Sequence, residues 1–447
     1  MFTIDHLKLI FSYNMNSNRT KYNKEFRTFE QKLCEECNQP ETNLNWCQPC
    51  NSKRFQQDFN KWSSGNKEID EFIQNIQLNA THCTELLEWI PYNRFKNIKY
   101  LAKGGFGTVY SAEWDDGIII RWDNSQNKWI RRKDYYEKVA LKCLNDSQHL
   151  HEDFFQEIIN HKKVTTAPVV PCYGISQDPK TKNYIMIMRY MEAGDLKQFI
   201  NRHDQNARGL INILSQINNT VHGLSQLHYE ELLHKDLHSG NLLFNSTENI
   251  FISDLGLCKP VNDQTKSNHE KKIYGILPYV APEVLRGNDY TKASDIYSFG
   301  ILAYEMISGL PPYHDLPHNE SLAIKICLGL RPKLNIKIPP CFSKLIELID
   351  QCLDADPLNR PTADELYKFT DNLFGVYGQT EERKQINEAN SYNKLMFLKS
   401  KMSSKIHPQA IYTSRPLDFK NLPEPQNSKE IYDLSDSLNV NFTNLDI

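Results

Sequence analysis

The segment around residue 236 combines three residue types that can carry out one reaction together. Asp236 is followed five residues later by Asn241, and Asp254 comes thirteen residues after that. A carboxylate can orient a hydroxyl group and accept its proton, while an amide and a second carboxylate can hold Mg²⁺ against phosphates. A single Asp or Asn in a loop is more often a turn former. The order and spacing of all three therefore predict phosphoryl-transfer chemistry.

Such a site needs a cradle for a nucleotide, and a glycine-rich segment upstream fits this role. Residues 101–110 contain three glycines without Cβ atoms, which allow a backbone to approach phosphates closely: Gly104, Gly105 and Gly107. The pattern predicts a strand, a glycine turn and a second strand. A third strand, Val139-Ala140-Leu141-Lys142, would place the ammonium of Lys142 where the α- and β-phosphates lie.

A helix is expected to begin near Asp153, because its apolar residues recur with helical spacing. Glu157 on this helix could form an ion pair with Lys142 and hold it in place. Glu152 is the alternative partner.

With these motifs, the chain resembles the protein kinase family, and more closely the tyrosine-kinase-like group of serine/threonine kinases. The resemblance covers roughly residues 95–374. It is supported by Ala281-Pro282-Glu283, by Asp295 at the start of an expected long helix, and by Arg360, which in this family pairs with the residue matching Glu283. It implies an α+β, two-lobed kinase fold with a β-rich small lobe and a helical large lobe.

The resemblance also implies ATP as the phosphoryl donor and Mg²⁺ as the cofactor. Catalytic roles would fall to Asp236, Lys142 and Glu157, and Mg²⁺ would be held by Asn241 and Asp254. Nucleotide contacts are expected from these two metal ligands and from Ala102, Gly104, Gly105, Gly107, Val109, Ala140, Lys142, Met188, Met191 and Asp195.

Four positions depart from the family pattern. Ala102 replaces the opening glycine of the phosphate loop, and Lys235 replaces an arginine before the catalytic aspartate. His238 stands where serine/threonine kinases place a lysine, and Ile276 stands where they place a threonine. Less positive charge would then face the transferred phosphoryl group, so slower turnover is expected. Serine/threonine specificity is preferred over tyrosine specificity.

Two other functions remain open at this point. One is a pseudokinase scaffold that binds nucleotide and partners, which His238 and Ile276 favour. The other is a small-molecule phosphotransferase, which the loop from His234 to Asn241 also resembles. Glu283, Asp295 and Arg360 argue against the second alternative.

A second motif near the amino terminus consists of four cysteines in two Cys-x-x-Cys pairs: Cys34, Cys37, Cys47 and Cys50. This spacing predicts a structural Zn²⁺ knuckle, since Zn²⁺ accepts a closed shell of four thiolates. A segment this short cannot build a hydrophobic core, so the metal would supply the free energy of folding. Two disulfides are the alternative, and they would require an oxidising compartment.

The remaining sequence completes the expected organisation of the chain. We expect an N-terminal segment (1–30), the knuckle (31–52), a helical linker (53–94), the kinase domain (95–374) and a mostly disordered, flexible tail (375–447). The linker should contain a one-faced helix, because residues 69, 72, 73 and 76 are apolar. Between residues 113 and 138 we expect an extended hairpin with a polar tip.

The composition of the chain also gives expectations about its binding partners and its location in the cell. The 447 residues carry a formal charge of −3 and contain no apolar run long enough to span a bilayer. Protein substrates are expected, with docking partners at the knuckle and the tail, and nucleic acid is disfavoured. Reduced cysteines would suit a cytoplasmic, alternatively nuclear, location.

Overall fold

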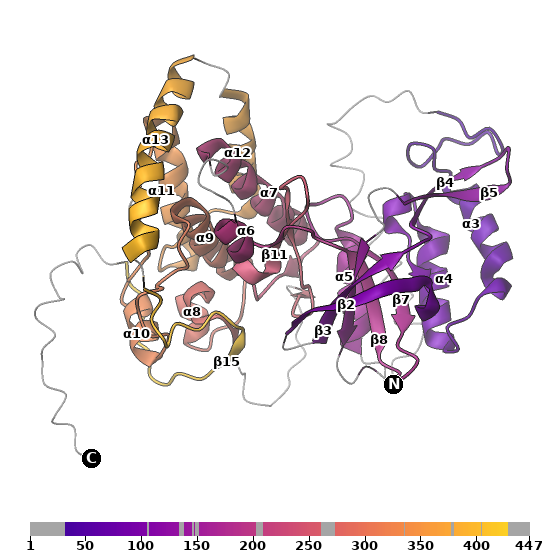
Figure 1. Ribbon diagram of the computed structural model, residues 1–447, viewed down its shortest axis with the longest axis horizontal. Helices are drawn as coiled ribbons and strands as arrows, with labels where there is room; N and C mark the ends of the chain where they lie inside the picture. Colours follow the sequence, from indigo (N-terminus) through magenta and orange to yellow (C-terminus); the bar gives the residue numbers. More distant parts are fainter. Residues whose placement is uncertain are drawn as a thin grey trace, which may run out of the picture. The chain divides into compact units, whose positions relative to one another are not determined.

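The computed structural model describes residues 32–104, 107–133, 138–144, 147, 152–202, 209–260, 273–334, 336–376, 380–403 and 405–427. The chain divides into two compact units. The first comprises Met1–His151 and Pro171–Tyr190, and the second comprises Glu152–Val170 and Met191–Ile447. The first is rich in strands and the second is mainly helical (Figure 1). This division confirms the expected β-rich and helical lobes.

The first unit is built on a six-stranded sheet with the order β1-β7-β8-β6-β3-β2. Its strands are β1 (Glu88–Trp89), β2 (Phe95–Lys103), β3 (Gly107–Trp114), β6 (Lys138–Leu144), β7 (Cys172–Gln177) and β8 (Tyr184–Arg189). Val139 and Leu141 of β6 and Ile185 and Ile187 of β8 lie in one buried cluster, because alternate residues of a strand point to the same face. This alternation fixes which side chains face the core.

Two helices precede the sheet in the same unit, α3 (Gln48–Asp58) and α4 (Lys67–Asn79). The side chain of Asn66 caps α4 by accepting hydrogen bonds from two backbone N–H groups of its first turn. The apolar residues predicted to share one face are all buried: Ile69, Phe72, Ile73 and Ile76. The one-faced helix of the linker is thus confirmed.

The predicted hairpin before β6 is also present, as β4 (Ile118–Asp123) and β5 (Lys128–Arg132). The Trp129 ring of β5 stacks on Phe55 of α3, with ring centroids 4.5 Å apart, and on Trp46, with centroids 6.0 Å apart. The hairpin therefore joins the four-cysteine segment to the first unit through an aromatic contact.

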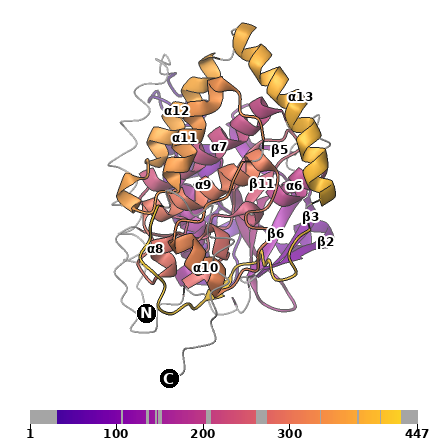
Figure 2. The same ribbon diagram turned by 90° about the vertical axis from the view of Figure 1, so that its left-hand side faces the viewer.

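The second unit surrounds the long helices α7 (Leu210–Tyr229) and α9 (Lys292–Ser308). Helix α9 is buried along most of its length, begins at a capping box on Thr291 and ends at Gly309, whose φ is 71°. Helix α12 (Ala363–Val376) packs along α7 (Figure 2). The other helices are α5 (Glu152–Lys163), α6 (Leu196–Arg202), α8 (Pro282–Leu285), α10 (Glu320–Cys327), α11 (Ser343–Cys352) and α13 (Thr380–Ser403).

The second unit also contains short strands. They form three small sheets: β9 (Gly194–Asp195) with β11 (Leu242–Phe244) and β12 (Ile250–Ile252), β10 (Leu232–Leu233) with β13 (Lys259–Pro260), and β14 (Ile273–Gly275) with β15 (Arg415–Leu417).

Part of the tail is more ordered than its composition predicts. Ile386 and Ala389 of α13 are buried in the core of the second unit, and Asn390 accepts a hydrogen bond of 3.0 Å from the backbone N–H of Leu210. These few apolar and polar contacts order a segment whose overall composition is polar. Residues 1–31 and 428–447 lie outside the described residues.

Candidate active site

The three residues with the predicted spacing come together in the second unit. The Asn241 amide nitrogen donates a hydrogen bond of 2.8 Å to the backbone carbonyl of Asp236. Strands β11 and β12 pair antiparallel, and the backbone N–H of Ser253 donates 2.8 Å to the carbonyl of Asn241. Asp254, the next residue, is thereby held beside the loop that carries Asp236 and Asn241.

Asp295, in the first turn of α9, holds the residues that directly precede Asp236. Its carboxylate accepts hydrogen bonds from the backbone N–H groups of His234 (2.8 Å) and Lys235 (2.9 Å), and it lies 3.1 Å from Nε2 of His228. Burial opposes ionisation of Asp295, but the hydrogen bond and charge of His228 hold its pKa below the ordinary value. Lys235 adopts the left-handed region, with a φ of 67°, so the carboxylate fixes a strained turn.

The space around Gly256 explains why a glycine follows Asp254-Leu255. A Cβ atom at this position would lie 3.3 Å from Oδ1 of Asp254 and 3.3 Å from Oε2 of Glu157. Glu157 on α5 and Asp254 therefore approach the same point of the second unit, and a side chain here would crowd both carboxylates. Asp254 itself has a φ of 59°.

The donor set of these loops fits Mg²⁺, which prefers oxygen ligands. Since the amide nitrogen of Asn241 is bonded to Asp236, its amide oxygen is the atom that can serve as a ligand. The carboxylate of Asp254 would supply the second oxygen ligand.

The nucleotide-cradle residues of the first unit lie on adjacent strands. Val109 of β3 is opposite Lys142 of β6 and also pairs with Ala102 of β2, while Ala140 is opposite Met188 of β8. At Gly107 a Cβ atom would lie 2.2 Å from the carbonyl oxygen of Cys143, so only glycine fits there. The backbone N–H of Gly104 bonds to the Gly107 carbonyl at 2.8 Å, and Gly105 lies outside the described residues.

Lys142 and Glu157 belong to different units, and their ion pair remains a prediction. The same holds for the nucleotide contacts of Met191 and Asp195, which lie in the second unit. Asp195 has a local structural role as well, because its carboxylate accepts a hydrogen bond of 2.7 Å from the backbone N–H of Gln198 at the start of α6.

The two unusual residues near the site have defined environments. Nε2 of His238 lies 3.6 Å from Oδ2 of Asp236, and Nδ1 accepts a hydrogen bond of 3.0 Å from the Gly240 backbone N–H. Ile276 is buried and precedes the short helical turn Leu277–Tyr279. His238 thus lies close to the carboxylate of Asp236, and the expectation that this position faces the transferred phosphoryl group stays a prediction.

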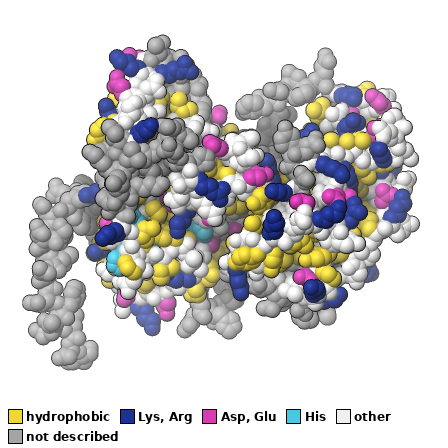
Figure 3. Space-filling view, viewed as in Figure 1, with side chains coloured by type: hydrophobic (Ala, Val, Ile, Leu, Met, Phe, Trp, Pro, Cys, Tyr) yellow, Lys and Arg dark blue, Asp and Glu magenta, His cyan; other side chains and the backbone are white. Residues whose placement is uncertain are grey.

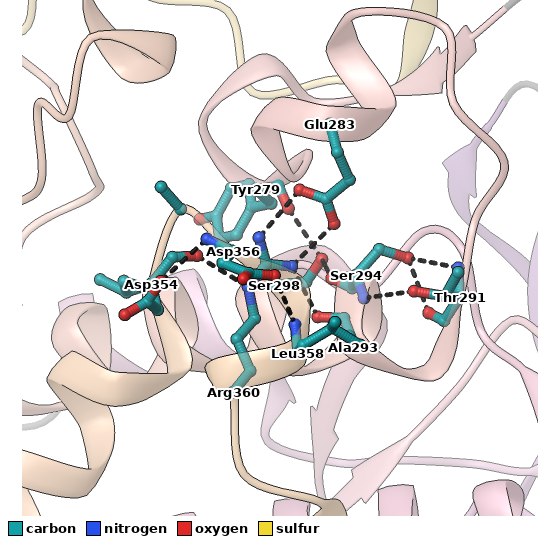
Figure 4. A network of polar contacts seen from close by, with 12 residues as sticks. Tyr279, Glu283, Thr291, Ala293, Ser294, Ser298, Asp354, Asp356, Leu358 and Arg360 are labelled. Atoms are coloured by element: carbon teal, nitrogen blue, oxygen red, sulfur yellow. Dashed lines mark hydrogen bonds and ion pairs between the residues drawn. The ribbon is translucent and has the colours of Figure 1, made fainter. Parts of the chain in front are cut away.

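The predicted pair Glu283–Arg360 is formed and buried. Arg360 donates two hydrogen bonds, of 2.7 and 2.8 Å, to the two carboxylate oxygens of Glu283. It also donates to the backbone carbonyls of Ala293 and Asp354 (Figure 4). One guanidinium therefore ties together α8, the start of α9 and the segment after α11.

The four cysteines predicted to bind a metal converge in the first unit. Their sulfur atoms all lie within 4.8 Å of one another. The Cys34–Cys50 and Cys37–Cys47 sulfurs are 3.8 and 3.5 Å apart, which is too far for disulfide bonds of about 2.05 Å. A tetrahedral ion with zinc–sulfur bonds of about 2.3 Å separates its ligands by about 3.8 Å. The four sulfur atoms are therefore close enough together to hold a zinc ion.

Comparison with known proteins assigns the family. Residues 95–369 match the protein tyrosine and serine/threonine kinase family, so the chain belongs to it. Within the described residues, no helix has the length and apolar character needed to cross a membrane.

Similar proteins include both kinds of kinase, which agrees with the resemblance to the tyrosine-kinase-like group of serine/threonine kinases. Serine/threonine-protein kinase STY17 of Arabidopsis thaliana is 27% identical over 56% of this chain and 42% of its own length. Serine/threonine-protein kinase CLA4 of Candida albicans is 29% identical over 67% of this chain and 29% of its own length. Tyrosine-protein kinase SPK-1 of Girardia tigrina is 28% identical over 61% of this chain and 52% of its own length. The chain covers at most about half of these relatives.

Proposed function

We propose that this chain is an ATP-dependent protein kinase that phosphorylates serine and threonine hydroxyls in signal transduction. The observation that carries the proposal is the arrangement of Asp236, Asn241 and Asp254 on two bonded loops of the second unit. Serine/threonine specificity is supported by an aliphatic hydroxyl, that of Ser414, which lies 2.8 and 3.0 Å from the two carboxylate oxygens of Asp236. The names of STY17 and CLA4 also support it.

In this proposal each residue has a limited task. Asp236 orients the acceptor hydroxyl and takes its proton, while Asn241 and Asp254 supply oxygen ligands. Mg²⁺, when bound, neutralises charge that develops on the phosphates. Lys142 binds the α- and β-phosphates and Glu157 positions Lys142. Catalysis then comes from positioning and charge stabilisation rather than from a covalent intermediate with the protein.

The proposal is tested by incubating the purified full-length chain with [γ-³²P]ATP, Mg²⁺ and dephosphorylated casein. Asp236→Asn and Lys142→Met should abolish transfer, whereas Lys138→Met, an exposed position on the same strand as Lys142, should not. Phosphoamino-acid analysis should find phosphoserine or phosphothreonine. Phosphotyrosine alone would overturn the specificity, and label that persists in Asp236→Asn would overturn the role of Asp236.

The pseudokinase alternative is favoured by His238 and Ile276, and one outcome of the same experiment would select it. ATP would then stabilise the chain against thermal unfolding without any transfer of label. The small-molecule phosphotransferase has less support, because the family match covers residues 95–369 and includes the Glu283–Arg360 pair.

A further inference from the structure

A segment of the tail runs past Asp236 of the second unit. Strand β15 pairs antiparallel with β14, with Leu417 opposite Ile273, Pro416 opposite Tyr274 and Arg415 opposite Gly275. Strand β14 lies between Asp254 and Glu283 in the sequence, and a Cβ atom at its Gly275 would lie 3.6 Å from Oδ1 of Asp236. A peptide that adds a strand to such an exposed edge is positioned by its backbone, and its side chains are presented in a fixed register.

The residue that precedes β15 reaches the catalytic aspartate. Oγ of Ser414 lies 2.8 Å from Oδ2 and 3.0 Å from Oδ1 of Asp236, and 3.2 Å from Nε2 of His238. This is the geometry that a general base needs toward the proton it removes. The chain itself thus places a serine hydroxyl where an acceptor hydroxyl has to lie.

Contacts before Ser414 hold the segment in this register. The backbone N–H of His318 donates 2.9 Å to the carbonyl of Gln409, and the Tyr412 hydroxyl donates 2.9 Å to the carbonyl of Pro312. The Tyr412 ring packs edge-on against His318, with centroids 4.8 Å apart.

Contacts after Ser414 also hold the tail segment on the second unit. Leu417 and Leu422 are buried in the core of the second unit. Arg286 forms a two-pronged ion pair with Glu424, and the backbone N–H of Gln426 donates 2.8 Å to the carbonyl of Cys327. Anchors on both sides, rather than a single contact, therefore deliver Ser414 to Asp236.

We propose that Ser414 is an intramolecular phosphoryl acceptor and that residues 407–426 occupy the protein-substrate site of the same chain. This inference rests on the proposed kinase function and deepens it. The Ser414 oxygen forms a bond to the γ-phosphorus of ATP, the bond from that phosphorus to the β–γ bridging oxygen breaks, and ADP leaves. The hydroxyl proton passes to Asp236.

Phosphorylation of Ser414 weakens the contact between Ser414 and Asp236. A phosphate on Ser414 carries nearly two negative charges and would stand beside the carboxylate of Asp236. Repulsion between them weakens the attachment of the segment. Before phosphorylation the segment competes with other protein substrates, and after it the site becomes accessible to them.

The first test follows phosphate on Ser414 by mass spectrometry in phosphatase-treated full-length protein incubated with Mg²⁺ and ATP, beside casein as an external acceptor. The wild type should approach one phosphate on Ser414 per chain, at a fractional rate that does not change with tenfold dilution of the protein. Thr413→Ala should behave in the same way, because Thr413 is exposed and lies one residue outside the contact. Ser414→Ala should lose only this phosphate.

The second test alters the anchor instead of the acceptor. Glu424→Arg places like charges together and should slow Ser414 phosphorylation and speed casein phosphorylation by about two- to fivefold, as expected for an exposed pair. The double exchange Arg286→Glu with Glu424→Arg restores opposite charges and should reverse both effects.

The outcomes separate this inference from the proposed function. Casein phosphorylation without phosphate on Ser414 would overturn the inference and leave the kinase function intact. Ser414 phosphate whose rate scales with protein concentration, or that appears on Asp236→Asn chains mixed with wild type, would overturn the intramolecular step. Failure of both acceptors would remove the kinase function and the inference together.

Discussion

The hydroxyl of Tyr279 donates a hydrogen bond of 2.6 Å to the carboxyl group of Glu305, deep in the second unit, and lies 3.1 Å from Oγ of Ser239, in the loop between Asp236 and Asn241. Tyr279 and Glu305 are both buried. Burial raises the pKa of Glu305 from its ordinary value of 4.5 to about 7, although hydrogen bonds from Tyr279 and Ser239 act in the opposite direction.

This raised pKa predicts a specific pH dependence of stability. Between about pH 4.5 and 7 the folded state holds a proton on Glu305 that the unfolded state has lost, so the unfolding free energy falls as pH rises. The loss is about 1.4 kcal/mol per pH unit and at most about 3 kcal/mol in total. Glu305→Gln should remove this component.

Urea unfolding of wild type and Glu305→Gln at pH 5, 6 and 7 isolates the effect. Buried histidines such as His234, whose pKa is lowered by burial, contribute an opposite slope that is common to both proteins. The difference in unfolding free energy between them should therefore shift in favour of the glutamine variant as pH rises. Parallel pH curves would refute the assignment.

The buried Glu283–Arg360 pair predicts a large loss of stability on substitution. The Arg360 side chain is fully buried and satisfies one carboxylate and two carbonyl groups. Arg360→Ala would leave them unpaired and should cost about 3 to 5 kcal/mol. Arg360→Lys keeps the charge but loses the planar fork, so it should also be destabilising.

Thermal or urea unfolding measures this cost. Lys368→Ala is the matched control in the same unit, because its ion pair with Asp364 spans one turn of α12 and is largely exposed. We expect a cost of about 0.5 kcal/mol or less there. Equal costs for the exposed and buried substitutions would contradict the role given to Arg360.

The four-cysteine cluster predicts one bound Zn²⁺ per chain. Trp46 beside Cys47 is almost fully buried, donates a hydrogen bond of 2.9 Å to the carbonyl of Ala80 and stacks near Trp129. Removal of the metal with a chelator, or Cys50→Ser, should unfold the knuckle and expose Trp46. Metal analysis should then find less than one zinc per chain, and tryptophan fluorescence should shift to longer wavelength.

Cys341→Ser controls for the loss of a thiol, because Cys341 belongs to the second unit and is not one of the four cysteines of the cluster. It should retain a full equivalent of zinc and the original fluorescence. A wild-type chain that holds no zinc after purification in zinc-containing buffer would refute the site.

The charged side chains on one face of the molecule are mixed in sign. Lys and Arg side chains are interspersed with Asp and Glu on the face shown in Figure 3. Nucleic-acid binding favours a concentrated basic surface, which the described residues of this face do not show (Figure 3); the expectation that nucleic acid is not a partner stays a prediction.

The parts of the site that sequence could predict are those fixed by local spacing. Asp236 and Asn241 are five residues apart in one loop, and the four cysteines lie in one short segment. The support from Asp295 and His228 was not predictable in the same way, because these residues are 67 positions apart and meet only when α7 and α9 pack. The contact of Ser414 with Asp236 spans 178 positions. It depends on strand addition by a segment whose polar composition suggests disorder.

The position of His238 leads to a last prediction, about the rate of the chemical step. Its ring faces Asp236 and Ser414, where a permanent cation would stabilise the negative charge of the transferring phosphoryl group. His238→Lys should therefore raise kcat toward casein, by about three- to tenfold, with little change in the KM for ATP. Ser414→Ala chains should be used, so that no internal acceptor competes.

His238→Asn separates charge from loop geometry. His238 accepts a hydrogen bond from the backbone N–H of Gly240, and asparagine can accept the same bond in an Asx turn while carrying no charge. Asparagine should therefore preserve the loop and give a kcat no higher than that of wild type. If His238→Lys and His238→Asn gave the same kcat, the charge at position 238 would not limit phosphoryl transfer. The slower turnover expected for this chain would then have to arise from Ile276. Ile276→Thr, measured alone and together with His238→Lys, distinguishes these two sources because independent effects on the barrier multiply in kcat.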